Sequence, residues 1–307
     1  MDRKEYIERW SDFKIEYSNL ITGLVLNSTL LLDSLPFGKT ENDKYDLRGI
    51  NLKDIDDLIG NQKPKLTEIV FHNCDFSYSN FDNLIIEKCQ FINCTFVSVY
   101  CRDLMEIDNV FSQCYFQKVD FRRAEIGIQN SKFNECIFEK CNFMGCLFAS
   151  PQFTNISFVN NNLREFDFAG SSFENCKFEG TMSHVAFRGN VPKYKKDNAE
   201  YKVNQMNQVS FENLDFNVLG FSEDCKLDHV TIKSNAKYLM VHEFKSKTAE
   251  LYHARNQYTE DTIDLIENLY FVAKDRNQNA YLFNTEDWFD EDSNVEEINA
   301  IFDFFRK

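Results

Sequence analysis

The middle third of the chain carries one apolar residue, usually phenylalanine, at every fifth position. The first run of these positions is Phe71, Phe76, Phe81, Ile86, Phe91, Phe96, Cys101, Glu106, Phe111, Phe116, Phe121 and Ile126. After a shift of two residues, the second run is Ile128, Phe133, Phe138, Phe143, Phe148, Phe153, Phe158, Leu163, Phe168, Phe173, Phe178 and Ser183. A period of five fits neither the 3.6 of a helix nor the 2 of a flat strand, so it indicates a repeat architecture.

A small or compact residue stands two positions before most of these centres, for example Cys74, Leu84 and Ala124. The other three positions of each unit are mostly polar. One large and one small residue pointing inward per five describes a chain wound around a narrow core. Four units would close a square coil of 20 residues, and stacked coils would pair at about the 4.8 Å spacing of β-strands.

The triplets Cys74-Asp75-Phe76, Val119-Asp120-Phe121 and Cys141-Asn142-Phe143 resemble the consensus of the pentapeptide-repeat family. The resemblance covers residues 69–187, with a short match at 46–52 and another between 214 and 227. It implies a mainly β fold, a right-handed quadrilateral β-helix. We expect this solenoid to have a helical N-terminal cap and an α-helical C-terminal region.

The pattern divides the chain into five segments. They are a helical cap and loop (1–45), the repeat β-helix (46–187), a basic projecting loop (188–208), a further repeat coil (209–233) and a C-terminal region (234–307). In the last segment, apolar residues at helical spacing predict helices over 261–274 and 295–305. That region is either a cap with a small helical domain or an oligomer interface, and a homodimer through it is one interpretation.

The formal net charge is −15, from 34 Lys and Arg against 49 Asp and Glu. This balance argues against direct nucleic-acid binding, which needs phosphate neutralisation. Acidic side chains precede the apolar stretch 20–35, which excludes an ordinary signal peptide, and the stretch is too short for a membrane span. These features predict a cytoplasmic protein with no membrane association.

Packing accounts for the ten cysteines without a metal or a disulfide. Eight of them stand two positions before a centre, Cys225 does so before Leu227, and Cys101 occupies a centre. Cysteine is a compact and readily buried side chain, so free core thiols in a reducing compartment are expected.

The chain also lacks the common catalytic and nucleotide-binding motifs, which predicts neither an enzyme nor a cofactor. An enzyme built on 234–307 is the least favoured alternative.

Defects in the repeat identify candidate binding residues. Glu106 occupies a centre, where burial would desolvate a charge, so a bulge at 102–109 is expected to export it to solvent. Normally outward positions nearby carry Val97, Tyr100, Met105, Ile107 and Tyr115, which form either a protein-binding surface or a contact with the N-terminal helices. The basic loop offers Lys193, Tyr194, Lys195 and Lys196. The outward carboxylates are Asp75, Asp82, Glu87, Asp120 and Glu125.

Two functions follow. The first is a non-catalytic protein-binding module. The resemblance implies, as one form of it, an acidic mimic of DNA that regulates or protects DNA gyrase or topoisomerase IV, with a type II topoisomerase as partner. The second is a scaffold or regulatory subunit of a bacterial toxin-immunity or phage-defence system, binding through its terminal helical regions. Acidity that serves only solubility is the plain alternative to mimicry.

Overall fold

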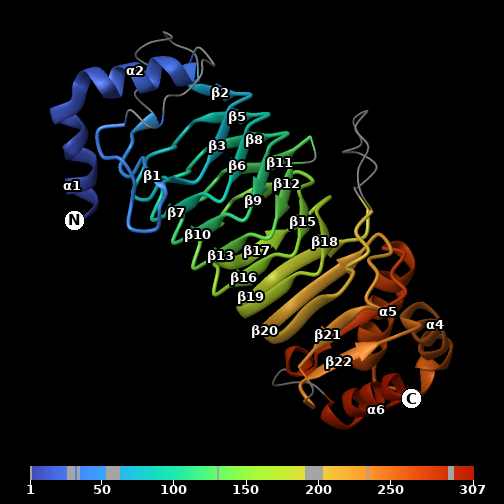
Figure 1. Ribbon diagram of the computed structural model, residues 1–307. Coiled ribbons are helices and arrows are strands. Elements are labelled where there is room, and N and C mark those ends of the chain that lie inside the picture. The colour runs from blue at the N-terminus through green and yellow to red at the C-terminus, as the bar shows by residue number, and fades with distance from the viewer. Residues whose placement is uncertain are drawn as a thin grey trace. The chain divides into compact units, whose positions relative to one another are not determined.

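The computed structural model describes residues 2–25, 32, 35–52, 63–129, 131–190, 203–233, 235–289 and 294–307. The chain forms two compact units, Met1–Leu163 and Arg164–Lys307. In the first unit, short parallel strands stack into successive coils (Figure 1).

Three sides of each coil in the first unit are strands. The first sheet contains β1 (Tyr45–Asp46), β4 (Cys74–Asp75), β7 (Thr95–Val97), β10 (Tyr115–Gln117), β13 (Ile137–Glu139) and β16 (Ser157–Val159). The second sheet contains β2 (Lys65–Thr67), β5 (Ile85–Glu87), β8 (Met105–Ile107), β11 (Glu125–Ile128) and β14 (Leu147–Phe148). The third contains β3 (Val70–His72), β6 (Gln90–Ile92), β9 (Val110–Ser112), β12 (Lys132–Asn134) and β15 (Gln152–Thr154). A fourth face is held by single bridges that link Asn80, Tyr100, Asp120, Asn142 and Asn162 in turn.

The strand register confirms the four-sided coil that the five-residue period predicts. Thr95 is the partner of Tyr115, twenty residues later. Tyr115 is the partner of Ile137, twenty-two residues later, so one coil accommodates the two-residue shift seen in the sequence. The fold is therefore the quadrilateral β-helix of pentapeptide-repeat proteins.

The corners explain why polar residues fill the rest of each unit. Two positions after each centre the backbone adopts a positive φ, as at Asn73 (53°), Asn83 (62°) and Asn93 (52°). Asparagine tolerates this left-handed conformation better than branched apolar residues do. The same corner position also carries long polar side chains, such as Lys88 (53°) and Arg123 (58°), so mostly polar residues make the turns of the repeat.

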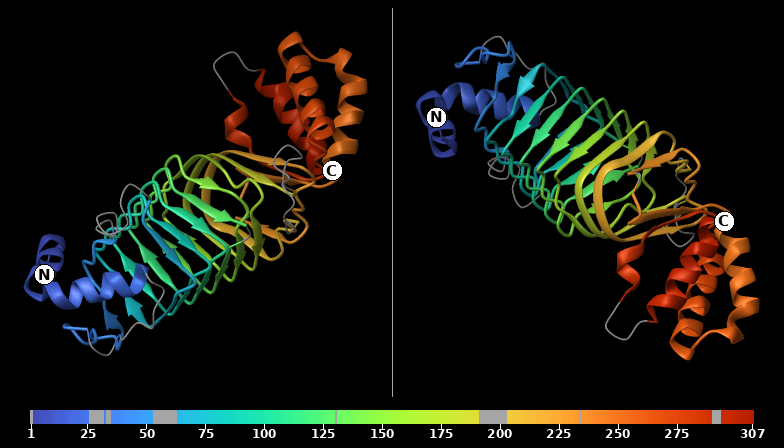
Figure 2. Two further views of the ribbon diagram at one scale, coloured as in Figure 1. Left: turned by 90° about the horizontal axis from the view of Figure 1, so that it is seen from above. Right: turned by 90° about the horizontal axis from the view of Figure 1, so that it is seen from below.

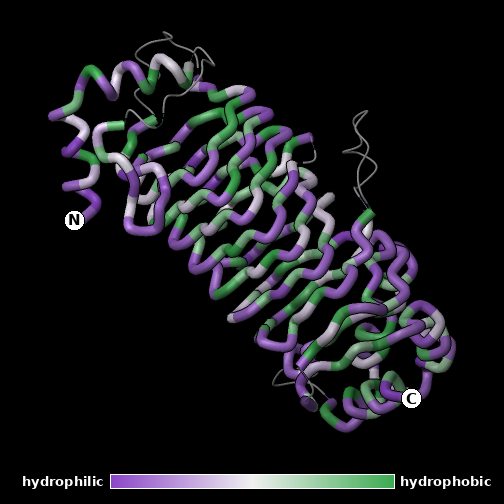
Figure 3. The backbone as a smooth tube through the Cα atoms, viewed as in Figure 1, coloured by the Kyte–Doolittle hydropathy of each residue, from purple (hydrophilic) through white to green (hydrophobic). Residues whose placement is uncertain are grey.

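Phenylalanine rings stack along the interior of the coils. Phe96 lies 4.8 Å from Phe116, and Phe116 lies 4.6 Å from Phe138, with interplanar angles of 7° and 5°. These rings are almost completely buried. Figure 3 shows hydrophobic and hydrophilic residues alternating along every coil, which is the short period of the repeat drawn on the backbone.

The predicted N-terminal cap is present and consists of α1 (Arg3–Glu8), η1 (Arg9–Phe13) and α2 (Lys14–Val25), at the N-terminal end of the coils (Figure 2). Trp10 Nε1 donates to the carbonyl oxygen of Arg48 at 3.0 Å, and the Tyr17 hydroxyl donates to that of Asn51 at 2.7 Å. An open β-helix end would otherwise expose these acceptors to strand pairing.

The second unit contains coil strands followed along the chain by an α/β region. Its coil strands are β17 (Leu163–Asp167), β18 (Ser172–Glu174), β19 (Lys177–Arg188), β20 (Val209–Ser222) and β21 (Val230–Ile232), of which β19, β20 and β21 pair in parallel. The following elements are β22 (Tyr238–Val241), α4 (Phe244–Ala254), η5 (Arg255–Gln257), α5 (Glu260–Asp275), β23 (Tyr281–Asn284), η6 (Thr285–Trp288) and α6 (Val295–Arg306). Helices α5 and α6 confirm the helices that the apolar spacing predicts over 261–274 and 295–305. The antiparallel pair β22–β23 was not predicted.

This C-terminal region caps β20 with side chains. The backbone N–H of Val218 donates to Asp287 at 2.7 Å, Asn284 Nδ2 donates to the carbonyl of Phe216 at 2.8 Å, and the Tyr281 hydroxyl donates to that of Leu219 at 3.2 Å. The region has its own apolar core, which includes Phe244 and Phe302. It therefore folds around itself and also satisfies the edge of the last long strand.

Candidate functional site

The structure does not bring the five predicted apolar residues together. Val97 on β7 and Tyr115 on β10 belong to the first sheet, Met105 and Ile107 lie together on β8 in the second, and Tyr100 lies on the fourth face. All except Tyr100 are only partly exposed. Lys193, Tyr194, Lys195 and Lys196 lie outside the described residues.

Tyr100 contacts the N-terminal helix, which is one of the two alternatives that the sequence left open for these residues. The guanidinium carbon of Arg3 lies 3.4 Å from the centre of the Tyr100 ring. Tyr115 is also engaged, because its hydroxyl donates to Glu139 at 2.5 Å. Burial and this carboxylate raise the pKa of Tyr115 to about 12.

The predicted acidic surface is wrong at two positions. Asp75 is 8% and Asp82 is 7% exposed, so both are buried. Asp75 accepts hydrogen bonds from the backbone and hydroxyl of Ser77, a local turn that draws the carboxylate inward. Burial raises the pKa of Asp75 above its usual range.

The other three predicted carboxylates lie nearer the surface. Glu87 pairs with Lys65, and Asp120 pairs with Arg122. Glu125 lies partly exposed on β11. Four of the five predicted residues are therefore buried or ion-paired.

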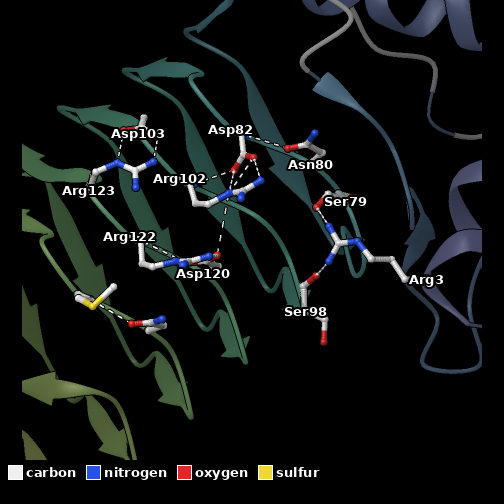
Figure 4. Close-up of polar contacts among 12 residues, drawn as sticks. Arg3, Ser79, Asn80, Asp82, Ser98, Arg102, Asp103, Asp120, Arg122 and Arg123 are labelled. Carbon is white, nitrogen blue, oxygen red and sulfur yellow. Dashed lines mark hydrogen bonds and ion pairs between the residues drawn. The ribbon is translucent and has the colours of Figure 1, made fainter.

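A ladder of ion pairs runs along the fourth face and its corner (Figure 4). It contains Asp82, Arg102, Asp103, Asp120, Arg122 and Arg123, here called the ladder. Arg122 donates to Asp120 from Nε at 2.8 Å and from Nη2 at 2.7 Å. Arg123 holds Asp103, twenty residues earlier, at the same two distances. Arg102 donates to Asp82 of the coil before and lies 4.0 Å from Asp120 of the coil after, so the pairs connect successive coils.

In every pair of the ladder the arginine is more exposed than the aspartate. The side-chain exposures are 37% for Arg102 against 10% for Asp82, and 36% for Arg122 against 14% for Asp120. Arg123 is 62% exposed against 38% for Asp103. Hydrogen bonds from Arg123 lower the pKa of Asp103 below its ordinary value, so the carboxylate stays ionised beneath its guanidinium. Although the chain is acidic overall, this face presents guanidinium groups.

Two exposed apolar side chains lie on the coil that follows the ladder. Asp120 bridges to Asn142, so Met144 follows Arg122 on the next coil of the same face, and it is 54% exposed. Leu147, three residues later on β14, is 41% exposed. Met144 and Leu147 are here called the apolar flank.

The structure also corrects the expectation for Glu106. This residue is 2% exposed, and β8 has no bulge that would export it. Its carboxylate accepts from Asn109 Nδ2 at 2.6 Å and from the backbone N–H of Gly127 at 2.7 Å. The irregular register of β11, between Glu125 and Ile128, places Gly127 there. The glutamate at a centre and the two-residue shift are thus one feature, in which an expanded coil supplies a donor to a buried acid.

The ten cysteines are free thiols, nine of them buried and Cys146 partly so. Burial raises the pKa of Cys89 to about 11 and that of Cys101 well above its ordinary value, which makes these thiols poor nucleophiles. Among the described residues, no three His, Cys, Asp or Glu side chains gather in a way that could hold a metal ion. No described helix combines the length and apolar character of a membrane-spanning segment.

Sequence reasoning missed Arg102, Arg122 and Arg123. The signal was present, because residues twenty apart occupy the same place on successive coils, and Asp82 with Arg102 and Asp103 with Arg123 are such pairs. Reading the sequence in columns of twenty would have matched these two acids with their bases, whereas Asp120 and Arg122 are only two residues apart.

Comparison with known proteins gives only distant structural likeness. Neither a protein-family model nor a curated protein sequence matches the chain. A trypsin-treated variant of QnrB1, a plasmid-mediated fluoroquinolone resistance protein, is 18% identical with a TM-score of 0.34, over 70% of this chain and 96% of that one. HetL is a pentapeptide repeat protein involved in heterocyst differentiation regulation in the cyanobacterium Nostoc sp. strain PCC 7120. It is 11% identical with a TM-score of 0.30, over 62% and 90% of the two chains.

Proposed function

We propose that this pentapeptide-repeat solenoid is a non-catalytic protein-binding module, and that the ladder with its apolar flank is its binding surface. The proposal rests on the arrangement of charges in the ladder, where the positive groups lie nearer the solvent than the negative ones. The arginines are more exposed than the aspartates that pair with them, and the next coil carries two exposed apolar side chains. Arginine and methionine are enriched in protein interfaces relative to the rest of protein surfaces.

The arrangement favours a partner that carries carboxylates next to an apolar side chain. A guanidinium has five N–H donors, and the pairing of Arg122 with Asp120 engages its Nε and Nη2. Donors therefore remain for a carboxylate of the partner. Because the aspartates already hold the guanidinium planes, little side-chain entropy is lost when the partner binds.

A type II topoisomerase is the finer proposal for the partner, following the family resemblance. Mimicry of DNA would need exposed carboxylates, and Asp75 and Asp82 do not supply them. A topoisomerase would instead be bound through an acidic patch of its own. Purified protein added to gyrase supercoiling reactions, with and without a quinolone, tests this partner. Unchanged supercoiling and unchanged drug sensitivity would exclude it.

A scaffold or regulatory subunit in a toxin-immunity or phage-defence system is the second candidate. Its support is the C-terminal α/β region, which has a separate core and exposes Phe271 and Val295, at 45% and 54%. These two side chains would bind the partner, or a second copy in a homodimer. Replacing both by Ser should then release the partner or halve the mass in solution.

Paired purifications from the native host separate the two surfaces. The test variant carries Arg122→Glu and Arg123→Glu, and the matched control carries Lys132→Glu on the third sheet, where Lys132 is also exposed. We expect a partner to be recovered with the wild type and the control but lost with the test variant. Recovery of the same proteins with all three chains would contradict binding through the ladder.

A further inference from the structure

The contact of Arg3 with the coils has the chemistry of a guanidinium-binding slot. Arg3 Nη1 donates to the carbonyl oxygen of Ser98 at 2.6 Å, and Nη2 donates to that of Ser79 at 3.0 Å. The two carbonyls belong to successive coils, and Figure 4 shows Arg3 reaching both. The Tyr100 ring adds a cation–π contact at 3.4 Å. The slot is thus lined by two acceptors and an aromatic face.

Helix α1, which carries Arg3, makes further contacts with the first coils. The Tyr6 ring stacks on Tyr78 with centroids 4.8 Å apart and an interplanar angle of 7°. Gly49 provides room for the helix backbone, because a Cβ at this position would lie 2.2 Å from the carbonyl oxygen of Tyr6. A side chain at Gly49 would therefore displace the helix.

Helix α1 is nevertheless held only by its surface contacts. None of its residues is buried, whereas Trp10, in the element that follows, is 5% exposed and anchored. The Lys4 and Glu8 side chains on its outer side are 80% and 63% exposed. Release of α1 would therefore uncover the slot without opening an apolar core.

We propose that the Ser79–Ser98–Tyr100 slot is an arginine-recognition site that Arg3 occupies as an internal pseudo-ligand, and that an arginine-bearing segment of another protein binds there when α1 leaves. The slot adjoins the ladder, because the guanidinium carbon of Arg102 lies 4.8 Å from the centre of the Tyr100 ring. The proposal for the slot does not depend on the proposed function of the ladder. The slot selects arginine over lysine, because two carbonyls on different coils match the two Nη atoms of one planar fork. A single ammonium would not span both acceptors.

Because Arg3 fills the slot, an external ligand must compete with it, and its apparent affinity for the intact chain is reduced. A tethered ligand acts at an effective concentration on the order of millimolar, so a competing segment binds the intact chain more weakly than an empty slot. The affinity of the emptied slot is therefore the quantity to measure.

The test uses the full chain with Arg3→Ala and Tyr6→Ala, and a synthetic peptide with the sequence of residues 2–9 as the probe. Saturation-transfer NMR on the peptide reports binding. We expect the double variant to bind the peptide at least about tenfold more tightly than the wild type does, since the wild-type slot is filled. The same peptide with its first arginine changed to lysine should lose most of the signal. Adding Tyr100→Ser to the double variant should also abolish it.

A matched control keeps the slot filled. Lys4→Ala with Glu8→Ala changes the outer side of the same helix and should behave as the wild type. Circular dichroism of each variant verifies the coils. Absence of peptide binding to a folded double variant would overturn the proposal. The contact of α1 with the coils would then serve only to stabilise the fold. Equal binding of the arginine and lysine peptides would overturn it as well.

Discussion

Replacing Glu106 by alanine tests the least expected feature of the interior. The carboxylate accepts from Asn109 Nδ2 and from the N–H of Gly127, and alanine leaves both donors buried without those acceptors. Asn109 cannot rotate its amide to compensate, because its Oδ1 already accepts from the backbone N–H of Cys89 at 2.7 Å. Asn109 Nδ2 keeps a second acceptor, the carbonyl oxygen of Ile86 at 2.8 Å. The larger loss is the acceptor of the Gly127 N–H, and an unsatisfied buried donor costs about 1–3 kcal/mol of unfolding free energy.

Glu125→Ala is the matched control. Glu125 lies on the neighbouring strand of the same sheet but is partly exposed, so its loss should change stability by no more than about 0.5 kcal/mol. Urea unfolding followed by circular dichroism measures both variants. If Glu106→Ala cost no more than Glu125→Ala, the carboxylate would point to solvent, and the burial argument would be refuted.

The pH dependence of the Glu106 effect has a defined sign. Burial raises the pKa of Glu106 above its ordinary value of 4.5, against the hydrogen bonds that lower it. The folded chain therefore binds more protons than the unfolded chain as pH rises from 4.5 to the folded pKa, and stability falls over that interval. The alanine variant lacks this slope, so its deficit should be largest near pH 4.5 and shrink toward neutral pH. A deficit that grows with pH would show the opposite shift.

Three further outcomes follow from the core. Phe138→Ala, in the middle of a ring stack, should cost about 3–5 kcal/mol in urea unfolding, whereas Ile137→Ala, 43% exposed, should cost far less; similar losses would refute the five-residue register. Gly127→Ala should cost at least about 2 kcal/mol, since φ is +85° and the new Cβ would lie 2.4 Å from Pro151 Cδ, and a neutral effect on melting would contradict this backbone. The ten thiols should react slowly with a thiol reagent until urea unfolds the chain, and elemental analysis should find no stoichiometric zinc; rapid labelling or one bound metal would argue against packing as their role.

The sequence by itself determined the coil and its core. A large residue every fifth position with a small one two places earlier can be buried only by a chain that turns after each unit. Phe116 and Phe138 stack where the period places them, and Cys136 and Cys141 are buried as predicted. The caps also followed from the sequence, because an open β-helix end leaves backbone groups unpaired. Local spacing suffices here because each unit repeats the same environment.

Only the tertiary structure decided the environment of the charges. Whether Glu106 is exported or buried depends on Gly127, a donor from the next coil that a two-residue expansion brings into reach. Whether Asp82 is an exposed acid or the inner half of an ion pair depends on Arg102, which the next coil places beside it. Arg3 reaches Ser98 across ninety-five residues, a contact that no repeat period contains. Burial follows from a pattern that every unit carries, whereas the state of a charge follows from which side chains the winding of the chain places beside it.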